Sequence, residues 1–153
     1  MLVAHVGIMG HDHIMLSCVK SHYTNQGIRA NKIVSVSLVD EAFLPKADYT
    51  GCVSGSKEDK SRLFDYEMGE AGAPVPKGVP LSMECEVDDI YETKGFDNFI
   101  LKIRNTYAKE AILGDNGKIS YEKLKPVLFS MVNYEYLSTG KIIGKCMHMN
   151  DGK

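Results

Sequence analysis

The clearest pattern in the chain is the alternation of hydrophobic and polar residues in two stretches of its second half. Residues 81–90 alternate Leu, Met, Cys and Val with Ser, Glu and Asp, and residues 98–107 repeat the pattern with Phe, Leu and Ile. A period of two predicts strands with one face on a core and the other in water. Lys94 and Gly95 mark a turn between them, so we expect an antiparallel pair. The face of the first strand that we expect in water carries Ser82, Glu84, Glu86 and Asp88.

Four other apolar stretches predict further strands. Residues 14–19 are hydrophobic at alternating positions and at most of those between, which predicts a mostly buried strand. Residues 33–38 place Val and Leu opposite two serines, which predicts a half-buried strand. Residues 1–10 are apolar and strand-like from the first position. Residues 141–148 predict a last strand, with Gly144 in its middle suggesting a bulge.

Short helices fit between these strands. Thr24 is a suitable N-cap for a helix over residues 25–30, and Asn31 can end that helix in the left-handed conformation. Asp40 can cap a second short helix over residues 41–44, because the proline that follows limits how far a regular helix can run.

Two loops and the strand count complete the predicted architecture. Residues 71–79 contain two glycines and two prolines, which predicts a loop that passes over the body of the protein. Residues 115–118 read Asp-Asn-Gly-Lys, a strong signal for a tight turn. With about six strands and short helices inserted between them, we expect a mainly β fold, a β-barrel with small helical additions.

Composition narrows the class of protein. The length of 153 residues is that of one domain, and the net charge of -2 gives no electrostatic reason to expect nucleic acid. The sequence has neither an apolar run long enough to span a membrane nor the plan of a signal peptide, so we expect a cytoplasmic protein. The four cysteines lack the spacing of zinc or iron–sulfur ligands and are interpreted as reduced thiols that pack among apolar neighbours.

A first polar segment, residues 20–24, follows the strand of residues 14–19. It reads Lys-Ser-His-Tyr-Thr and precedes the predicted helix. A strand that leads into a helix N-terminus, with positive donors at the junction, has the geometry that phosphate prefers. The alternative is that Thr24 only caps the helix while Tyr23 packs on Ile28 as a hydrophobic staple. That alternative leaves the first three residues unexplained, so an anion site stays open.

A second polar segment, residues 47–60, gathers small hydroxyls and ammonium groups around two glycines. These residues are Thr50, Ser54, Ser56, Lys57 and Lys60. Glycine permits close approach of a ligand to the backbone. An ordinary solvated surface turn accounts for the same composition, so both interpretations remain open.

Other motifs give weaker indications. His11 and His13 share one face of an extended segment and could form half of a metal site, but no further ligands with suitable spacing follow nearby. A polar turn explains them as well, and we expect no metal. The chain contains no G-x-S-x-G motif, which argues against a hydrolase of that type.

Taken in order, the motifs resemble those of the flavin reductase-like proteins with an FMN-binding split barrel, a family that includes the flavoredoxins. The resemblance covers nearly the whole chain, and several motifs in the same order are more specific than any single one. They are Lys20-Ser21-His22-Tyr23-Thr24 with Gly27-Ile28, Ala47-Asp48-Tyr49-Thr50-Gly51 with Val53-Ser54-Gly55 and Asp59-Lys60, residues 81–86, Asp115-Asn116-Gly117-Lys118-Ile119 with residues 122–126, and Gly140 with Ile143-Gly144-Lys145.

The resemblance implies a homodimer of Greek-key split β-barrels that holds FMN non-covalently near the subunit interface. The whole chain, residues 1–153, would be a single flavin reductase-like domain. The resemblance carries cofactor binding, with the phosphate at the first group, onto Ser17, Lys20, Ser21, His22 and Thr24, and further contacts onto Asp48, Tyr49, Ser54 and Lys60.

The chain departs from the family pattern at two points. The family normally has at least one more strand before the position where this chain begins, and that segment contributes to the isoalloxazine pocket. Without it, an edge strand would be left unpaired. In addition, His5 stands where relatives tend to carry Trp, so stacking on the flavin ring would be weakened or replaced.

The leading functional hypothesis is a flavoprotein oxidoreductase that passes electrons between NAD(P)H, or a redox protein, and FMN. The cofactor carries this chemistry, so no protein acid, base or nucleophile is assigned. Two alternatives stay open. One is a flavin-binding electron carrier without reductase turnover, and the other is a cofactor-free dimeric scaffold.

Overall fold

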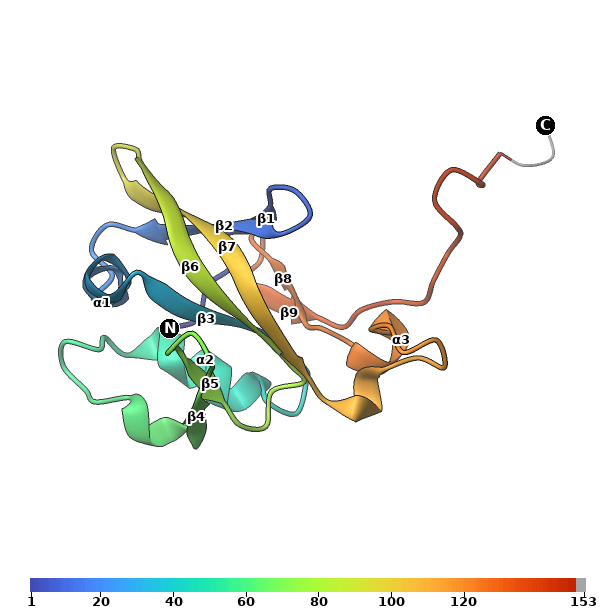
Figure 1. Ribbon diagram of the computed structural model, residues 1–153, viewed down its shortest axis with the longest axis horizontal. Coiled ribbons are helices and arrows are strands. Elements are labelled where there is room, and N and C mark those ends of the chain that lie inside the picture. The colour runs from blue at the N-terminus through green and yellow to red at the C-terminus, as the bar shows by residue number, and fades with distance from the viewer. Residues whose placement is uncertain (151–153) are drawn as a thin grey trace.

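The computed structural model describes residues 1–150 and has a mainly β fold (Figure 1). Two short 3-10 turns, Ser61–Leu63 and Glu110–Ile112, join some of its elements. The helices are α1 (Thr24–Asn31), α2 (Leu44–Cys52) and α3 (Tyr121–Leu124). The strands are β1 (Val6–Ile8), β2 (His13–Val19), β3 (Ile33–Leu38), β4 (Tyr66–Met68), β5 (Pro74–Pro76), β6 (Leu81–Glu92), β7 (Phe96–Ala108), β8 (Leu128–Ser130) and β9 (Glu135–Leu137).

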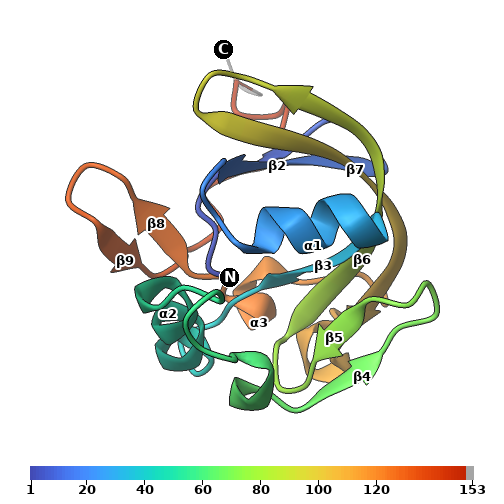
Figure 2. The same cartoon turned by 90° about the vertical axis from the view of Figure 1, so that its left-hand side faces the viewer.

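Five strands form one antiparallel sheet in the order β1-β2-β7-β6-β3, and β4–β5 and β8–β9 form two separate hairpins. Figure 2 shows the large sheet curving around α1. The sheet does not close on itself, because β1 and β3 remain its two edges. This open, curved arrangement is a split barrel, in agreement with the predicted fold class.

The core lies between the curved sheet and α1. Ile14 and Leu16 of β2 stand opposite Leu101 and Phe99 of β7, and all four are almost fully buried. Ile28 of α1 packs into the same cluster. The hydrophobic faces predicted from the alternation therefore meet, which is the main source of stability for a sheet of this kind.

Four of the six predicted strands are confirmed, and within residues 1–10 only Val6–Ile8 form a strand, β1. Residues 14–19, 33–38 and 81–90 lie within β2, β3 and β6, and residues 98–107 lie within β7. The tight turn after Gly114 is also present, with Gly117 in the left-handed region. The prediction succeeded here because each strand has one mostly apolar face that packs on the core, although in β3 every residue is only half-buried.

The predicted solvent face of β6 is wrong at Ser82 and Glu84, which are both buried. The Glu84 side chain is 0% exposed because the loop between β4 and β5 covers it, and Gly69 approaches it so closely that a side chain there would collide with the carboxylate. Burial alone raises the pKa of the Glu84 carboxyl. Hydrogen bonds from the Asn105 side chain, from two backbone amides of the loop and from the Tyr107 hydroxyl outweigh that effect and lower the pKa to about 2.

The predicted helix over residues 41–44 is wrong. Asp40 accepts a hydrogen bond from the Phe43 amide at 2.9 Å, but the helix that follows is α2, which begins at Leu44 and includes Pro45 in its first turn. Proline is tolerated there because the first amides of a helix have no partner within the helix. The beginning of the second polar segment is consequently helical, although composition favoured a turn.

The boundaries of α1 differ from the prediction at both ends. Thr24 is the first residue of the helix, not its N-cap, and no side chain caps this end. The amides of Asn25 and Gln26 instead donate to the His22 and Tyr23 carbonyls. At the other end Lys32, not Asn31, adopts the left-handed conformation.

Two further predictions fail, the strand near the C-terminus and the loop in the middle of the chain. The described part of the chain has no strand within residues 141–148, and these residues extend away from the body (Figure 1). The predicted loop of residues 71–79 contains β5, which pairs with β4.

Among the described residues, no helix is long and apolar enough to cross a membrane.

Candidate functional site

The first polar segment forms the connection between β2 and α1 and lies at the surface. Ser21 and His22 are exposed, and Thr24 is half-buried. Within residues 1–150, the side chains of these three residues have no hydrogen-bond partner. Two hydroxyls and an imidazole therefore remain available to a ligand at the start of a helix.

Lys20, the fourth predicted ligand in this segment, is tied to the hairpin between β6 and β7. Its Nζ lies 3.0 Å from Glu92 Oε2, and Glu92 Oε1 accepts from Arg29 Nη2 at 2.8 Å. Arg29 also donates to Asp97 at 2.9 Å. The hydrogen bond from Lys20 has the largest effect on the pKa of Glu92 and that from Arg29 the next largest. Together they lower this pKa below its usual value. Sequence reasoning missed Arg29 and both carboxylates, because they lie on other elements.

Asn25 lies beneath this network and has one unsatisfied atom. Its Nδ2 donates to Asp97 Oδ2 at 2.8 Å and to the Val19 carbonyl at 3.1 Å, which fixes the orientation of the amide. Its Oδ1 is buried and has no partner among the described residues. A buried acceptor of this kind is normally met by a donor from water or from a ligand.

The structure brings the second polar segment against the first. The Tyr23 ring lies against Gly55, where an added Cβ would be only 3.0 Å from the ring and 3.8 Å from Cε of Lys60. The two segments are far apart in sequence but form one continuous surface.

The predicted ligands of the second polar segment are bonded within the protein. Lys60 Nζ donates to the Thr50 and Val53 carbonyls at 2.7 and 2.8 Å, at the C-terminal end of α2. Tyr49 donates to Glu58 at 3.0 Å. Ser54 shares a hydrogen bond with the Ser56 hydroxyl at 2.9 Å.

Asp48 points to a different part of the molecule. Its Oδ1 accepts a hydrogen bond from the Tyr136 hydroxyl of β9 at 2.5 Å. This hydrogen bond, together with burial, raises the pKa of Tyr136 to about 12. Asp48 thus joins α2 to the β8–β9 hairpin.

Ser17, the remaining predicted residue, lines a cavity of about 370 Å³ beside the edge strand β1. Its hydroxyl donates to Asn98 Oδ1 at 2.6 Å, and Asn98 Nδ2 donates to the Tyr91 carbonyl at 2.8 Å. His5 lies in the same wall, edge-on to Phe96 at 5.7 Å. The rest of the wall is mostly apolar, formed by Ala4, Val6, Gly7, Met15 and Thr93. The volume and the mostly apolar lining fall within the range of small-molecule sites, but the cavity is open to solvent and not enclosed.

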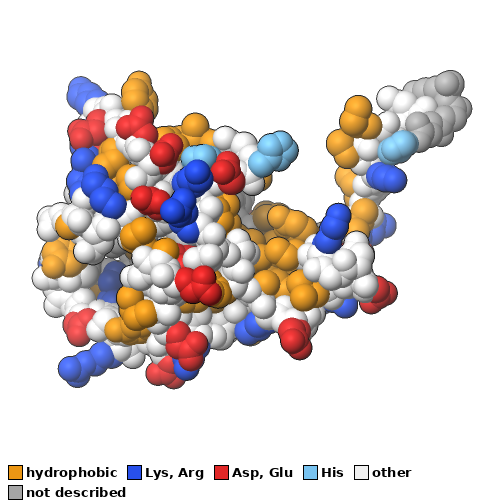
Figure 3. Space-filling view, viewed as in Figure 1, with side chains coloured by type: hydrophobic (Ala, Val, Ile, Leu, Met, Phe, Trp, Pro, Cys, Tyr) orange, Lys and Arg blue, Asp and Glu red, His pale blue; other side chains and the backbone are white. Residues whose placement is uncertain are grey.

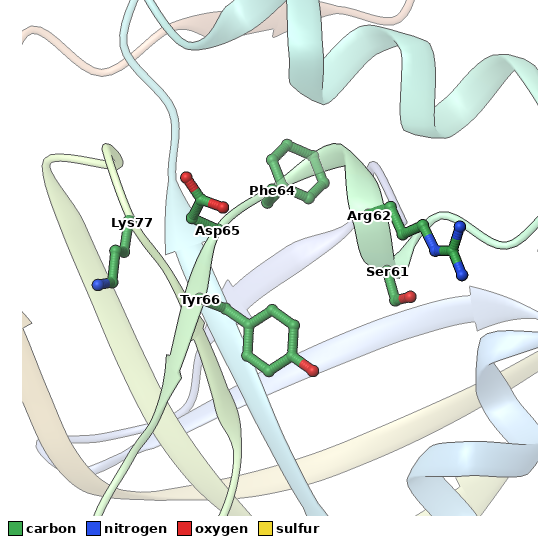
Figure 4. Close-up of a pocket in the computed structure, with 6 residues that line it drawn as sticks. All are labelled: Ser61, Arg62, Phe64, Asp65, Tyr66 and Lys77. Atoms are coloured by element: carbon green, nitrogen blue, oxygen red, sulfur yellow. The ribbon is translucent and has the colours of Figure 1, made fainter.

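A larger hollow of about 510 Å³ lies elsewhere and contains no predicted ligand. Figure 4 shows Arg62 and Lys77 at opposite ends of it, with their side chains directed apart. Lys77 is already paired with Glu67 at 2.6 Å. Because its cationic groups diverge, we favour the smaller cavity beside β1 as the ligand site.

The paired histidines and the cysteines are the remaining candidate groups from the sequence. Among residues 1–150, no three His, Cys, Asp or Glu side chains form a group that could hold a metal ion. His13 instead contacts Asp12 at 2.7 Å and Asp88 at 3.6 Å. Burial raises the pKa of the Cys18 and Cys85 thiols to about 11, so both remain protonated at neutral pH, as expected for packing thiols. The same prediction is wrong for Cys52 and Cys146, which are exposed.

Comparison with solved structures identifies close relatives. The chain is 33% identical to flavoredoxin from Methanosarcina acetivorans, with a TM-score of 0.90 over 94% of this chain and 78% of that chain. It is 29% identical to flavoredoxin of Desulfovibrio vulgaris (Miyazaki F), with a TM-score of 0.86 over 94% and 80%. A protein with a split barrel domain from Shewanella frigidimarina is 15% identical, with a TM-score of 0.81 over 94% and 75%, and supports the fold alone.

A comparison with curated proteins gives no significant match. Residues 1–138 match the model of the flavin reductase like domain, which is most of the chain. The chain therefore belongs to the flavin reductase-like family, whose split-barrel fold it shares.

Proposed function

We propose that this protein binds FMN and works as a flavin-dependent oxidoreductase. The observation that carries the proposal is the unpartnered group of Ser21, His22 and Thr24 at the start of α1, close in sequence to a mostly apolar cavity. Ser17 in the cavity wall precedes Lys20 by three residues, about 10 Å along an extended strand. FMN has a phosphate at one end, which suits the polar donors, and a flat ring system at the other, which suits the apolar cavity.

The available side chains fit the phosphate end. Hydroxyl and imidazole donors, with a lysine in the same segment, are groups that bind phosphate oxygens. The buried Asn25 Oδ1 is an acceptor, so it suits a hydroxyl of the ligand chain better than the phosphate itself. Within the cavity, Ser17 and Asn98 offer polar contacts to a ring edge.

Bound FMN would supply the hydride and electron chemistry, and the protein would bind, orient and shield it. The apolar wall beside β1 excludes water from one side. The raised pKa of the Cys18 and Cys85 thiols leaves them protonated and unsuited to nucleophilic attack. Electrons would come from NAD(P)H or from a redox protein in the cytoplasm, where free thiols such as these stay reduced.

The proposal includes a homodimer. Three hydrophobic side chains, on β1, after β8 and in the C-terminal tail, are almost fully exposed: Ile8 at 87%, Val132 at 87% and Ile143 at 83%. Figure 3 shows hydrophobic side chains lining the recess between the body and this tail. We propose that a second copy of the chain covers these exposed apolar side chains.

A flavin titration tests the proposal. Purified protein is titrated with FMN while flavin fluorescence and the visible spectrum are recorded, and its mass is measured by light scattering. We expect saturable binding at micromolar FMN and the mass of a dimer. Absence of saturable binding would refute the proposal.

Turnover distinguishes the reductase from its nearest alternative. A reductase oxidises NAD(P)H steadily when free FMN is supplied, whereas an electron carrier binds flavin without steady turnover. A stable dimer that binds no flavin would favour the scaffold.

A further inference from the structure

We infer that Glu92 competes with the phosphate of the ligand for Lys20, and so sets how strongly the protein prefers a phosphorylated flavin over an unphosphorylated one. The inference rests on the proposed function, since it concerns the same site. It adds a residue that lies outside the first polar segment and carries the wrong charge to bind phosphate.

Glu92 divides its two carboxylate oxygens between two cations. Oε2 lies 3.0 Å from Lys20 Nζ, while Oε1 lies 2.8 Å from Arg29 Nη2. Lys20 can therefore leave Glu92 without stranding a charge, because the Oε1 contact to Arg29 remains. Arg29 is itself held in place by the buried Asp97 at 2.9 Å.

Lys20 has the freedom to change partners. Its side chain is 41% exposed, and Glu92 is the only hydrogen-bond partner of its ammonium among residues 1–150. Exposed lysine side chains exchange rotamers within nanoseconds. Lys20 directly precedes Ser21, so a phosphate held by Ser21 and Thr24 would lie within reach of its long side chain.

The balance between the two anions is predicted to be close. An exposed ion pair is worth little in water, and a phosphate carries more charge than a carboxylate. Glu92 therefore weakens phosphate binding without preventing it. Riboflavin, which has no phosphate, should be insensitive to this competition.

Glu86 provides a matched control on the same strand. It is also half-exposed, at 47% against 52% for Glu92, and also forms an ion pair, with Arg104 at 3.3 Å. Glu86→Gln and Glu92→Gln therefore remove the same charge from β6, but only Glu92→Gln frees Lys20. General electrostatic effects should appear in both variants.

The experiment measures the affinities of FMN and riboflavin for the wild type, Glu92→Gln, Glu86→Gln, Lys20→Met and the double variant Lys20→Met/Glu92→Gln. We expect Glu92→Gln to raise the ratio of FMN to riboflavin affinity about threefold, the scale of an exposed ion pair, and Glu86→Gln to leave it unchanged. The gain should disappear in the Lys20→Met background, because the two residues act on each other.

The outcomes separate this inference from the proposed function. If FMN and riboflavin bind but Glu92→Gln leaves their ratio at the Glu86→Gln value, or if the gain survives without Lys20, the inference is wrong and the proposed function stands. If no variant binds either flavin, the proposed function fails and the inference falls with it.

Discussion

The two polar segments have similar composition but differ in where their hydrogen bonds go. In the first, residues 20–24, the side chains of Ser21, His22 and Thr24 have no partner within the described part of the protein. In the second, residues 47–60, all four predicted ligands have partners within the protein. Tyr49, Ser54 and Lys60 bond inside the segment, and Asp48 bonds to Tyr136 of β9.

This difference in hydrogen bonding suggests that the first segment serves ligand binding and the second serves stability of the fold. A polar side chain that is already bonded internally contributes to folding, and recruiting it to a ligand would cost that contribution. An exposed side chain without an internal partner can bond a ligand at little cost to the fold. We therefore expect the first segment to provide ligand contacts and the second to hold the surface against which it lies. The following variants test this division, from the largest expected effect to the smallest.

Replacing Lys60 should cause the largest loss of stability. Lys60→Met removes two charge-assisted hydrogen bonds to the C-terminal carbonyls of α2 and a favourable interaction with the helix dipole, and should lower the free energy of unfolding by about 2 kcal/mol. Urea denaturation measures this loss. Lys57→Met is the matched control, because the exposed Lys57 side chain has no partner among residues 1–150. Equal effects of the two substitutions would contradict the assignment of Lys60 to stability.

The link between Asp48 and Tyr136 should make stability depend on pH at the alkaline end. The hydrogen bond to Asp48 raises the pKa of Tyr136 from 10.0 to about 12, so the neutral phenol stabilises the folded state. This contribution is complete below pH 10 and is lost as the pH rises from 10 towards 12.

Tyr136→Phe should lower the free energy of unfolding by about 1 kcal/mol at neutral pH and flatten the decline between pH 10 and 12. Chemical denaturation across this range measures both effects. A decline of unchanged steepness in the variant would show that other groups cause it.

The same substitution in each segment gives the most direct comparison. Thr24 and Thr50 both lie in helices. Among residues 1–150 only the Thr50 hydroxyl has a hydrogen-bond partner, the Ala47 carbonyl, to which it donates at 2.7 Å. Thr24→Val should weaken FMN binding about fivefold and leave stability nearly unchanged. Thr50→Val should lower the free energy of unfolding by about 1 kcal/mol and leave FMN affinity unchanged. Each variant serves as the control for the other, and a reversal of the two patterns would overturn the division.

The smallest effect is expected at Ser54. Among residues 1–150, its hydroxyl bonds only to the exposed Ser56, to the hydroxyl at 2.9 Å and the backbone amide at 3.3 Å, so water can replace both partners. Ser54→Ala should change both FMN affinity and the free energy of unfolding by less than about 0.5 kcal/mol. A loss of FMN affinity as large as that expected for Thr24→Val would show that Ser54 contacts the ligand.

Sequence patterns placed the four longest strands of the sheet correctly, missed the β4–β5 and β8–β9 hairpins, and placed the helix boundaries poorly. Residues 33–38 were placed correctly because the alternating Val34 and Val36 pack, half-buried, against the core. The helix before Pro45 was placed wrongly because a proline that can end a helix can equally occupy its first turn. Glu84 was expected in water because its own strand gives no sign of the loop that covers it.

The amino-acid sequence by itself determined the strand pattern, the location of the two polar segments and, through its ordered motifs, the family. These features depend on residues that are neighbours along the chain. Only the tertiary structure decided which polar groups remain available to a ligand, since Lys20 meets Glu92, Asp48 meets Tyr136 and Tyr23 meets Gly55 across long separations in sequence. A hydrogen bond can occupy a side chain however far away its partner lies in sequence. Whether a polar side chain remains available to a ligand is therefore decided by the folded structure.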